Sequence, residues 1–275
     1  MKLDSHQHFW HYKAEEYDWM GPGMEDLQSD HLPANLFPLL AAARIDGTIA
    51  VQARQTLEET RWLLSLARQH AFIKGVVGWV DLCSPDVREQ LAGFSADPKF
   101  VGVRHVVHDE ADGKFMLQES FIHGIGALAE FGLTYDLLLF PQHLPVACEL
   151  VARFPEQPFI LDHIAKPFIK DGVLVPWDAD LRRLAAFPNV VCKVSGMVTE
   201  AAWNAWEPAD FRPYLDVVFE AFGAERIMFG SDWPVCTVAA SYREVVSIET
   251  DYVEGLSADE REAVWGGTAA RCYGN

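Results

Sequence analysis

The chain has 275 residues, of which 50% are hydrophobic and 23% charged, and its formal net charge is −18. This length fits one large domain with a single core. The negative charge repels phosphate backbones and anionic lipids, so we expect neither nucleic acid nor a membrane surface as a partner.

The start of the chain, MKLDSHQHFW, contains no apolar run of the kind found in a signal peptide. No stretch reaches the roughly 18 apolar residues that a spanning helix needs. The five cysteines include no C-x-x-C pair, so neither a disulfide framework nor a zinc–cysteine site is indicated. We therefore expect a cytoplasmic protein.

Short apolar runs typical of buried parallel strands recur along the whole chain. We predict eight strands, at Leu3–Phe9, Gly47–Ala53, Ile73–Leu82, Phe100–Val107, Leu133–Phe140, Phe159–Ile164, Val190–Met197 and Ile227–Gly230. In the segments between most of these strands, apolar residues recur at the spacing of a helix. The predicted helices are Glu58–His70, one beginning at Ser84-Pro85, Pro141–Phe154, Asp178–Phe187, Pro208–Phe222, Ser241–Glu254 and Ser257–Cys272.

Strands that alternate with helices predict a parallel sheet, and eight repeats favour closure into a (β/α)8 TIM barrel of one domain. The alternative is an open doubly wound sheet, but no G-x-G-x-x-G follows the first predicted strand. One long connection, about 11–46, is rich in acidic, aromatic, Gly and Pro residues. We expect it to be a loop that forms a wall or lid over the pocket; a surface ornament is the alternative.

Two histidines, His6 and His8, lie near the end of the first predicted strand. Their spacing of two puts both side chains on one face of the strand. Active sites of barrels lie at the C-terminal ends of the strands, and two imidazoles on one face can bind one metal ion. An H-x-H pair is weak evidence by itself, because polar side chains are also common at strand ends.

His163 and Asp232 occupy matching places after the sixth and eighth predicted strands. Each has an ordinary alternative, a core histidine bonded to backbone and a helix-capping aspartate. In a closed barrel, however, the first and eighth strands are neighbours. The four side chains are therefore predicted to converge on one small cavity.

Other polar residues lie within or just after predicted strands. Gln52 follows the second, Trp79 lies in the third, Arg104 in the fourth and Asp136 in the fifth. A charged residue in an apolar strand is costly unless it is satisfied, so Arg104 and Asp136 are candidates for the pocket. A salt bridge between the two is the alternative.

Several motifs resemble the amidohydrolase superfamily. They are H-Q-H-F-W, V-Q-A, L-D-H-x-x-K-P, K-x-S-G, F-G-S-D-W-P and the ending AVWGGTAARCYG. Within the amidohydrolase-2 family they look like the branch of sugar lactonases, of the L-fuconolactonase and L-rhamnonolactonase kind. The resemblance spans essentially the whole chain.

The resemblance implies that His6, His8, His163 and Asp232 are metal ligands, and that Asp232 also handles the proton of the attacking water. The chain departs from binuclear relatives, because no bridging lysine or glutamate stands in the fourth strand and Asp136 replaces a histidine in the fifth. That points to one divalent ion at most, with zinc expected. Relatives of this branch that work without metal leave the requirement open.

The implied activity is hydrolysis of a small neutral sugar lactone, of the L-fucono or L-rhamnono type. Asp232 and His163 are the expected catalytic residues, and Gln52, Trp79, Arg104 and Asp136 are expected to contact sugar hydroxyls. Two alternatives stay open: a metal-dependent decarboxylase of a small unsaturated acid, and a non-catalytic sugar-binding barrel. Amide or phosphotriester hydrolysis is disfavoured, because the sequence shows no second set of residues that could bind another metal ion. Whether the chain forms a homo-oligomer is also left open.

Overall fold

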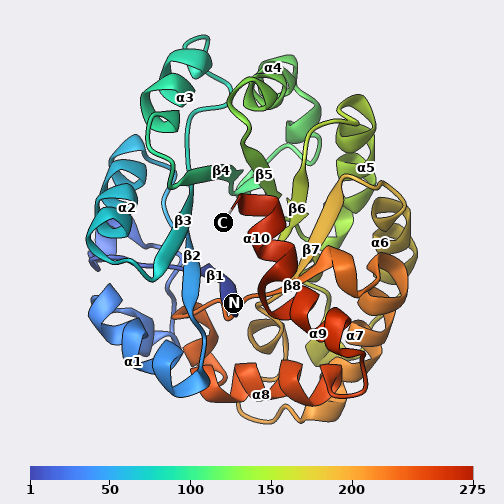
Figure 1. The fold of residues 1–275 in the computed structure, drawn as a ribbon. Coiled ribbons are helices and arrows are strands. Elements are labelled where there is room, and N and C mark those ends of the chain that lie inside the picture. Colours follow the sequence, from blue (N-terminus) through green and yellow to red (C-terminus); the bar gives the residue numbers. More distant parts are fainter. Residues whose placement is uncertain (275) are drawn as a thin grey trace.

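Eight parallel strands in sequential order form the centre of the molecule (Figure 1), in a computed structural model that describes residues 1–274. They are shorter than predicted, because several predicted strands continue into loops at their C-terminal ends. Their bounds are β1 Leu3–Gln7, β2 Gly47–Val51, β3 Ile73–Gly78, β4 Phe100–His105, β5 Thr134–Leu137, β6 Phe159–Leu161, β7 Val190–Val194 and β8 Ile227–Phe229.

Helices surround the sheet and connect its strands (Figure 1). One of them, α4, was not predicted, because two glycines in ESFIHGIGAL lower its helix propensity. The bounds are α1 Pro33–Ala43, α2 Leu57–Gln69, α3 Val87–Ser95, α4 Glu119–Leu128, α5 Leu144–Arg153, α6 Trp177–Ala185, α7 Pro208–Phe222, α8 Tyr242–Val253, α9 Ala258–Glu262 and α10 Thr268–Tyr273.

The sheet closes where the first and last strands meet. The His8 amide donates to the carbonyl of Trp233 (2.7 Å), and the Asp232 amide donates to the carbonyl of His6 (2.8 Å). The predicted (β/α)8 barrel is thus confirmed. The bonds that close it are made by residues predicted to form the site, so closure of the barrel fixes their backbones relative to one another.

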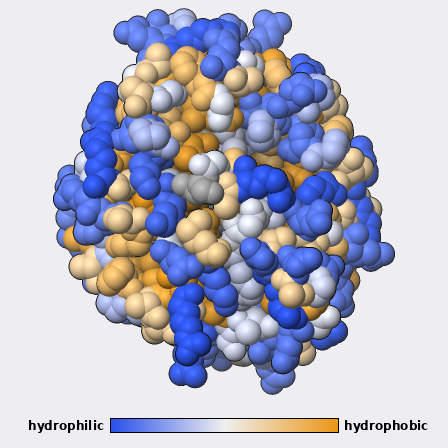
Figure 2. All heavy atoms as spheres, viewed as in Figure 1, coloured by the Kyte–Doolittle hydropathy of each residue, from blue (hydrophilic) through white to orange (hydrophobic). Residues whose placement is uncertain are grey.

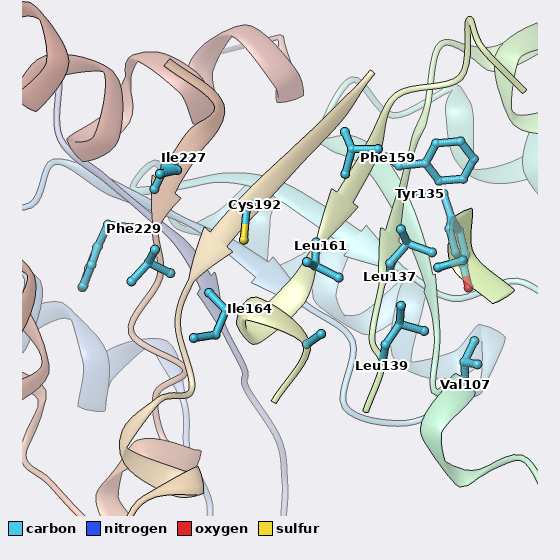
Figure 3. Close-up of a cluster of buried hydrophobic side chains, with 14 of the residues drawn as sticks. Val107, Tyr135, Leu137, Leu139, Phe159, Leu161, Ile164, Cys192, Ile227 and Phe229 are labelled. Atoms are coloured by element: carbon cyan, nitrogen blue, oxygen red, sulfur yellow. The ribbon is translucent and has the colours of Figure 1, made fainter. Parts of the chain in front are cut away.

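Two apolar layers hold the barrel together. The outer layer lies between sheet and helices; Figure 3 shows side chains of β5 to β8 in it, including Leu137, Leu161 and Phe229. The inner layer fills the barrel and includes Leu3 and Ile160. Alternate residues of each strand supply the two layers, which explains why the strands read as continuous apolar runs.

The C-terminal helix α10 lies across one end of the barrel (Figure 1). Its residues Ala269 and Tyr273 are buried in the inner layer with Leu3 and Met228. Polar and charged side chains are spread around this face, with hydrophobic residues between them (Figure 2). The helix therefore seals the end of the barrel where the strands begin.

The segment predicted as a loop at about 11–46 needs a correction, because its second half is helix α1. The two prolines of PANLFPLLAAA obscured this helix, yet Pro33 stands at its first turn, where proline is favoured. Residues 11–32 form the actual loop. It packs through the buried Tyr17, and Glu16 pairs with Arg54 at 2.7 Å.

None of the helices in residues 1–274 combines the length and apolar character needed to cross a membrane.

Glu249 on α8 is a buried acid. Its side chain is 1% exposed, and neither carboxylate oxygen has a hydrogen-bond partner within residues 1–274. Burial raises its pKa from 4.5 to about 8. Between these two values the folded state holds a proton that the unfolded state has lost. Stability is therefore predicted to fall as pH rises through this window, by about 1.4 kcal/mol per pH unit at most.

Glu249→Gln should remove this dependence. We expect the free energy of unfolding of the variant, taken relative to that of the wild type, to be higher at pH 8 than at pH 5 by about 2 kcal/mol or more. Urea unfolding at the two pH values measures this. Glu254→Gln, on an exposed residue just after the same helix, is the control and should show no such difference. Parallel stability curves for wild type and Glu249→Gln would contradict the prediction.

Candidate active site

Three imidazoles surround one carboxylate oxygen at the C-terminal end of the barrel. The Oδ1 atom of Asp232 lies 3.3 Å from Nε2 of His8, 3.8 Å from Nε2 of His163 and 3.9 Å from Nε2 of His6. All four side chains are buried. The structure thus brings together the four residues that the sequence placed at separate strand ends.

Each imidazole is held from behind through its other nitrogen. Nδ1 of His8 donates to the carbonyl of Val51 at 2.8 Å, and Nδ1 of His163 lies 2.8 Å from Oγ of Ser195. Nδ1 of His6 lies 3.2 Å from Oδ1 of Asp162. These contacts leave every Nε2 directed at the centre, which is the arrangement of metal-binding histidines.

The protonation states also suit a cation. Burial lowers the pKa of His163 to about 4 and the pKa of His6 well below its usual range. Burial acts to raise the pKa of Asp232, but the imidazoles of His163, His8 and His6 outweigh it and hold that pKa well below its usual range. At neutral pH the site therefore offers unprotonated imidazole nitrogens and an ionised carboxylate, as metal binding requires.

The donor set fits a divalent ion such as zinc, which takes imidazole nitrogen and carboxylate oxygen in fourfold coordination. Ligand atoms of His6, His8 and Asp232 lie within 4.8 Å of one another, and so do those of His6, Asp162 and His163. Arg104 limits the space, because its Nη1 lies 3.2 Å from Nε2 of His6. A guanidinium at this place disfavours a second cation beside the first.

Two glycines make room for the imidazoles. A Cβ atom on Gly196 would lie 2.6 Å from Nδ1 of His163, and one on Gly230 would lie 2.7 Å from Cβ of His6. His163 and Asp232 themselves have left-handed backbones, with φ of 54° and 57°. Non-glycine residues in this conformation are strained and cluster at functional sites. These contacts explain the glycines of K-x-S-G and F-G-S-D.

Asp4 supports the turn that carries Asp232. It is fully buried and accepts hydrogen bonds from the Ser231 amide (2.9 Å), the Ser231 hydroxyl (2.6 Å) and the Tyr242 hydroxyl (3.0 Å). Sequence reasoning missed this residue. An acid inside a strand predicted to be buried was the available signal, because such a charge needs partners.

A cavity of about 210 Å³ opens above the imidazoles and has His8, His163 and Asp232 in its lining. Arg104 also lines it, as do two cavity-wall tryptophans, Trp10 and Trp19. This volume suits a small molecule such as a single sugar ring. The loop 11–32 that carries Trp19 is thus part of the cavity wall.

Comparisons with known proteins find similarity to amidohydrolases over nearly the whole chain. The family model described as Amidohydrolase matches residues 3–274. The chain belongs to the amidohydrolase family. The resemblance read from the motifs is thereby confirmed.

This amidohydrolase is 46% identical to a protein of Burkholderia multivorans named L-fucono-1,5-lactonase, over 99% of this chain and 96% of the relative. A protein of the same name from Burkholderia ambifaria is 36% identical, over 99% of this chain and 95% of the relative. A crystal structure of a Burkholderia multivorans amidohydrolase with bound zinc superposes with a TM-score of 0.96 at 46% identity, covering 100% of this chain and 99% of the other.

The amidohydrolase cavity does not include three of the residues predicted to contact sugar. Gln52 is fully buried and braces Arg104, which donates to its backbone carbonyl. Trp79 turns its indole N–H toward Nδ1 of His105, at 3.4 Å. Asp136 is fully buried and pairs with Lys193. Arg104 alone of the four lines the cavity.

Three other cavity-lining residues of this amidohydrolase were missed by sequence reasoning. His108 and Asp109 follow β4, and Lys166 follows β6. His108 stacks on Phe140 with ring centres 4.6 Å apart, and burial lowers its pKa to about 3. His108 and Asp109 lie in a single 3-10 turn and Lys166 directly follows another, and sequence periodicity does not predict such short irregular segments. The lysine of L-D-H-x-x-K-P was the one available signal.

Proposed function

We propose that this protein is a carboxylic ester hydrolase that opens a sugar lactone to its sugar acid, with L-fucono-1,5-lactone the first substrate to test. The supporting observation is the three-imidazole and Asp232 centre at the base of a small cavity, in a chain 46% identical to a named L-fucono-1,5-lactonase. An L-rhamnono-lactone is the nearest alternative substrate.

In the proposed mechanism, Asp232 takes a proton from the attacking water while the oxygen of that water bonds to the lactone carbonyl carbon. The bond from that carbon to the ring oxygen then breaks, and Asp232 returns the proton to the ring oxygen. The guanidinium of Arg104, on the cavity wall, stabilises negative charge on the carbonyl oxygen. The product acid ionises and releases one proton at neutral pH.

The low pKa of Asp232 makes it a weak base. One ion held by His6, His8, His163 and Asp232 would act as a Lewis acid and lower the pKa of water at the site. We propose a single ion, with zinc the first candidate. Whether turnover needs it is decided by adding a chelator.

The charge of the cavity favours a neutral lactone over an anionic acid. Two cations line it, and each is already paired: Arg104 with Asp162 at 3.1 Å and Lys166 with Glu200 at 2.8 Å. A decarboxylase substrate would bring a carboxylate that has to compete with these partners. Hydroxyl groups can instead bond to His108, Asp109 and Lys166, while the tryptophans offer flat faces to a sugar ring.

A pH-indicator assay over a panel of aldonolactones, with and without chelator, tests the proposal. We expect L-fucono-1,5-lactone to release acid well above the spontaneous rate. CO2 release from an unsaturated acid, with no acid release across the lactone panel, would replace the lactonase by a decarboxylase. Sugar binding without turnover of any lactone would indicate a binding protein.

A further inference from the structure

The C-terminal helix reaches the centre of the barrel through one side chain. Tyr273 on α10 is 4% exposed, and its hydroxyl donates to Oδ2 of Asp136 at 3.1 Å. Asp136 lies on β5 with its side chain inside the barrel. The end of the chain is thus hydrogen-bonded to the strand interior beneath the active site.

From Asp136 the contacts continue to a proposed metal ligand. Nζ of Lys193 lies 2.5 Å from Oδ2 of Asp136, 3.1 Å from Oδ1 of Asp162 and 3.3 Å from Nδ1 of His6. All four side chains are fully buried, so water does not screen these interactions. We call Tyr273, Asp136 and Lys193 the buried relay.

Nδ1 of His6 has two neighbours with opposite demands. The carboxylate of Asp162, at 3.2 Å, can only accept a hydrogen bond, whereas the ammonium of Lys193 can only donate one. If Asp162 accepts a proton from Nδ1, Nε2 carries a lone pair toward the centre. If Lys193 donates to Nδ1, a neutral His6 carries its proton on Nε2, where it would block a cation and oppose the N–H donors of Arg104, whose Nη1 lies 3.2 Å away.

We propose that the buried relay, together with the Arg104 donor at Nε2, selects the first of these tautomers, with Tyr273 as a positioning residue that acts from the far end of the barrel. Tyr273 orients Asp136, and Asp136 together with Asp162 engages the protons of Lys193, so that Nδ1 of His6 donates to Asp162. The inference rests on the proposed metal centre, and it assigns an active-site role to the C-terminal helix.

Tyr273→Phe, which removes the hydroxyl and keeps the ring, is the test variant. We expect its zinc dissociation constant to rise about tenfold, which is the usual effect of losing a side chain that supports a metal ligand from behind. We expect kcat/KM to fall in parallel. In the metal-free protein labelled with ¹⁵N-histidine, proton–nitrogen correlation spectra should show the His6 proton moving, wholly or partly, from Nδ1 to Nε2.

Tyr135→Phe is the matched control. Tyr135 precedes Asp136 on the same strand but faces the outer apolar layer (Figure 3), so it takes no part in the buried relay. We expect its zinc affinity and its His6 spectrum to match the wild type. Loss of thermal stability without the zinc and tautomer changes, in Tyr273→Phe, would reduce Tyr273 to a packing residue and overturn the proposal.

If Tyr273→Phe does not fold, Asp136→Asn tests the same relay with an isosteric side chain. We expect a rise of about 10- to 100-fold in the zinc dissociation constant. An unchanged constant and an unchanged His6 tautomer in this variant would likewise overturn the proposal. Both readouts are independent of lactone turnover, so a wild-type protein inactive on lactones would refute the proposed function and still report on the relay.

Discussion

Asp232→Asn is expected to lower kcat by about a thousandfold, the usual scale for losing a general base. The asparagine amide cannot take a proton from water or return it to the ring oxygen. The substitution keeps the shape of the side chain, and the backbone bond from residue 232 to the His6 carbonyl does not depend on it. The loss should therefore lie in turnover rather than in folding, which kcat and a thermal melt measure together.

Asp109→Asn is the control for Asp232→Asn, because it removes a carboxylate from the same cavity. The Asp109 side chain is 70% exposed, and no step of the proposed mechanism assigns it a proton. We expect less than about a tenfold change, mainly in KM, since one hydrogen bond to substrate is at stake. If the Asp232→Asn variant keeps a tenth of the wild-type kcat, another group must accept the proton of the attacking water.

The sequence predicts the barrel and the central residues well for one physical reason. Strands buried on both faces read as apolar runs, and closure of eight such strands forces their C-terminal ends into one ring. His6, His8, His163 and Asp232 stand at or just after those ends, so their convergence follows from topology alone. No side-chain detail was needed.

The salt bridges between charged side chains inside the barrel could not be predicted in the same way. Arg104 and Asp136 are direct neighbours in the register of β4 and β5, which by itself would favour the alternative of a salt bridge between them. The structure instead pairs Arg104 with Asp162, and Asp136 with Lys193. Several buried charges compete for partners there, because Lys193 contacts both Asp136 and Asp162 while Arg104 also contacts Asp162. The spacing of residues along the chain carries no such information.

Gly196→Ala is expected to lower kcat/KM by about a hundredfold, although Gly196 has no chemical role. The new Cβ would lie 2.6 Å from Nδ1 and 2.9 Å from Cγ of His163, so the imidazole has to move. Its contact with the Ser195 hydroxyl would be lost with that movement. Displacements of about 1 Å in a catalytic arrangement cost about this factor. Steady-state kinetics and zinc titration would both detect it.

Gly132→Ala separates this clash from backbone strain. Gly132 has a φ of +66°, close to the +63° of Gly196, but a Cβ there would meet no atom within 4 Å. Both variants should lose about 1–2 kcal/mol of stability from the left-handed backbone. Only Gly196→Ala should also lose activity and zinc affinity, because only there does the methyl group reach a proposed metal ligand. Equal activity in the two variants would mean that His163 can shift without harm, and would remove it from the catalytic centre.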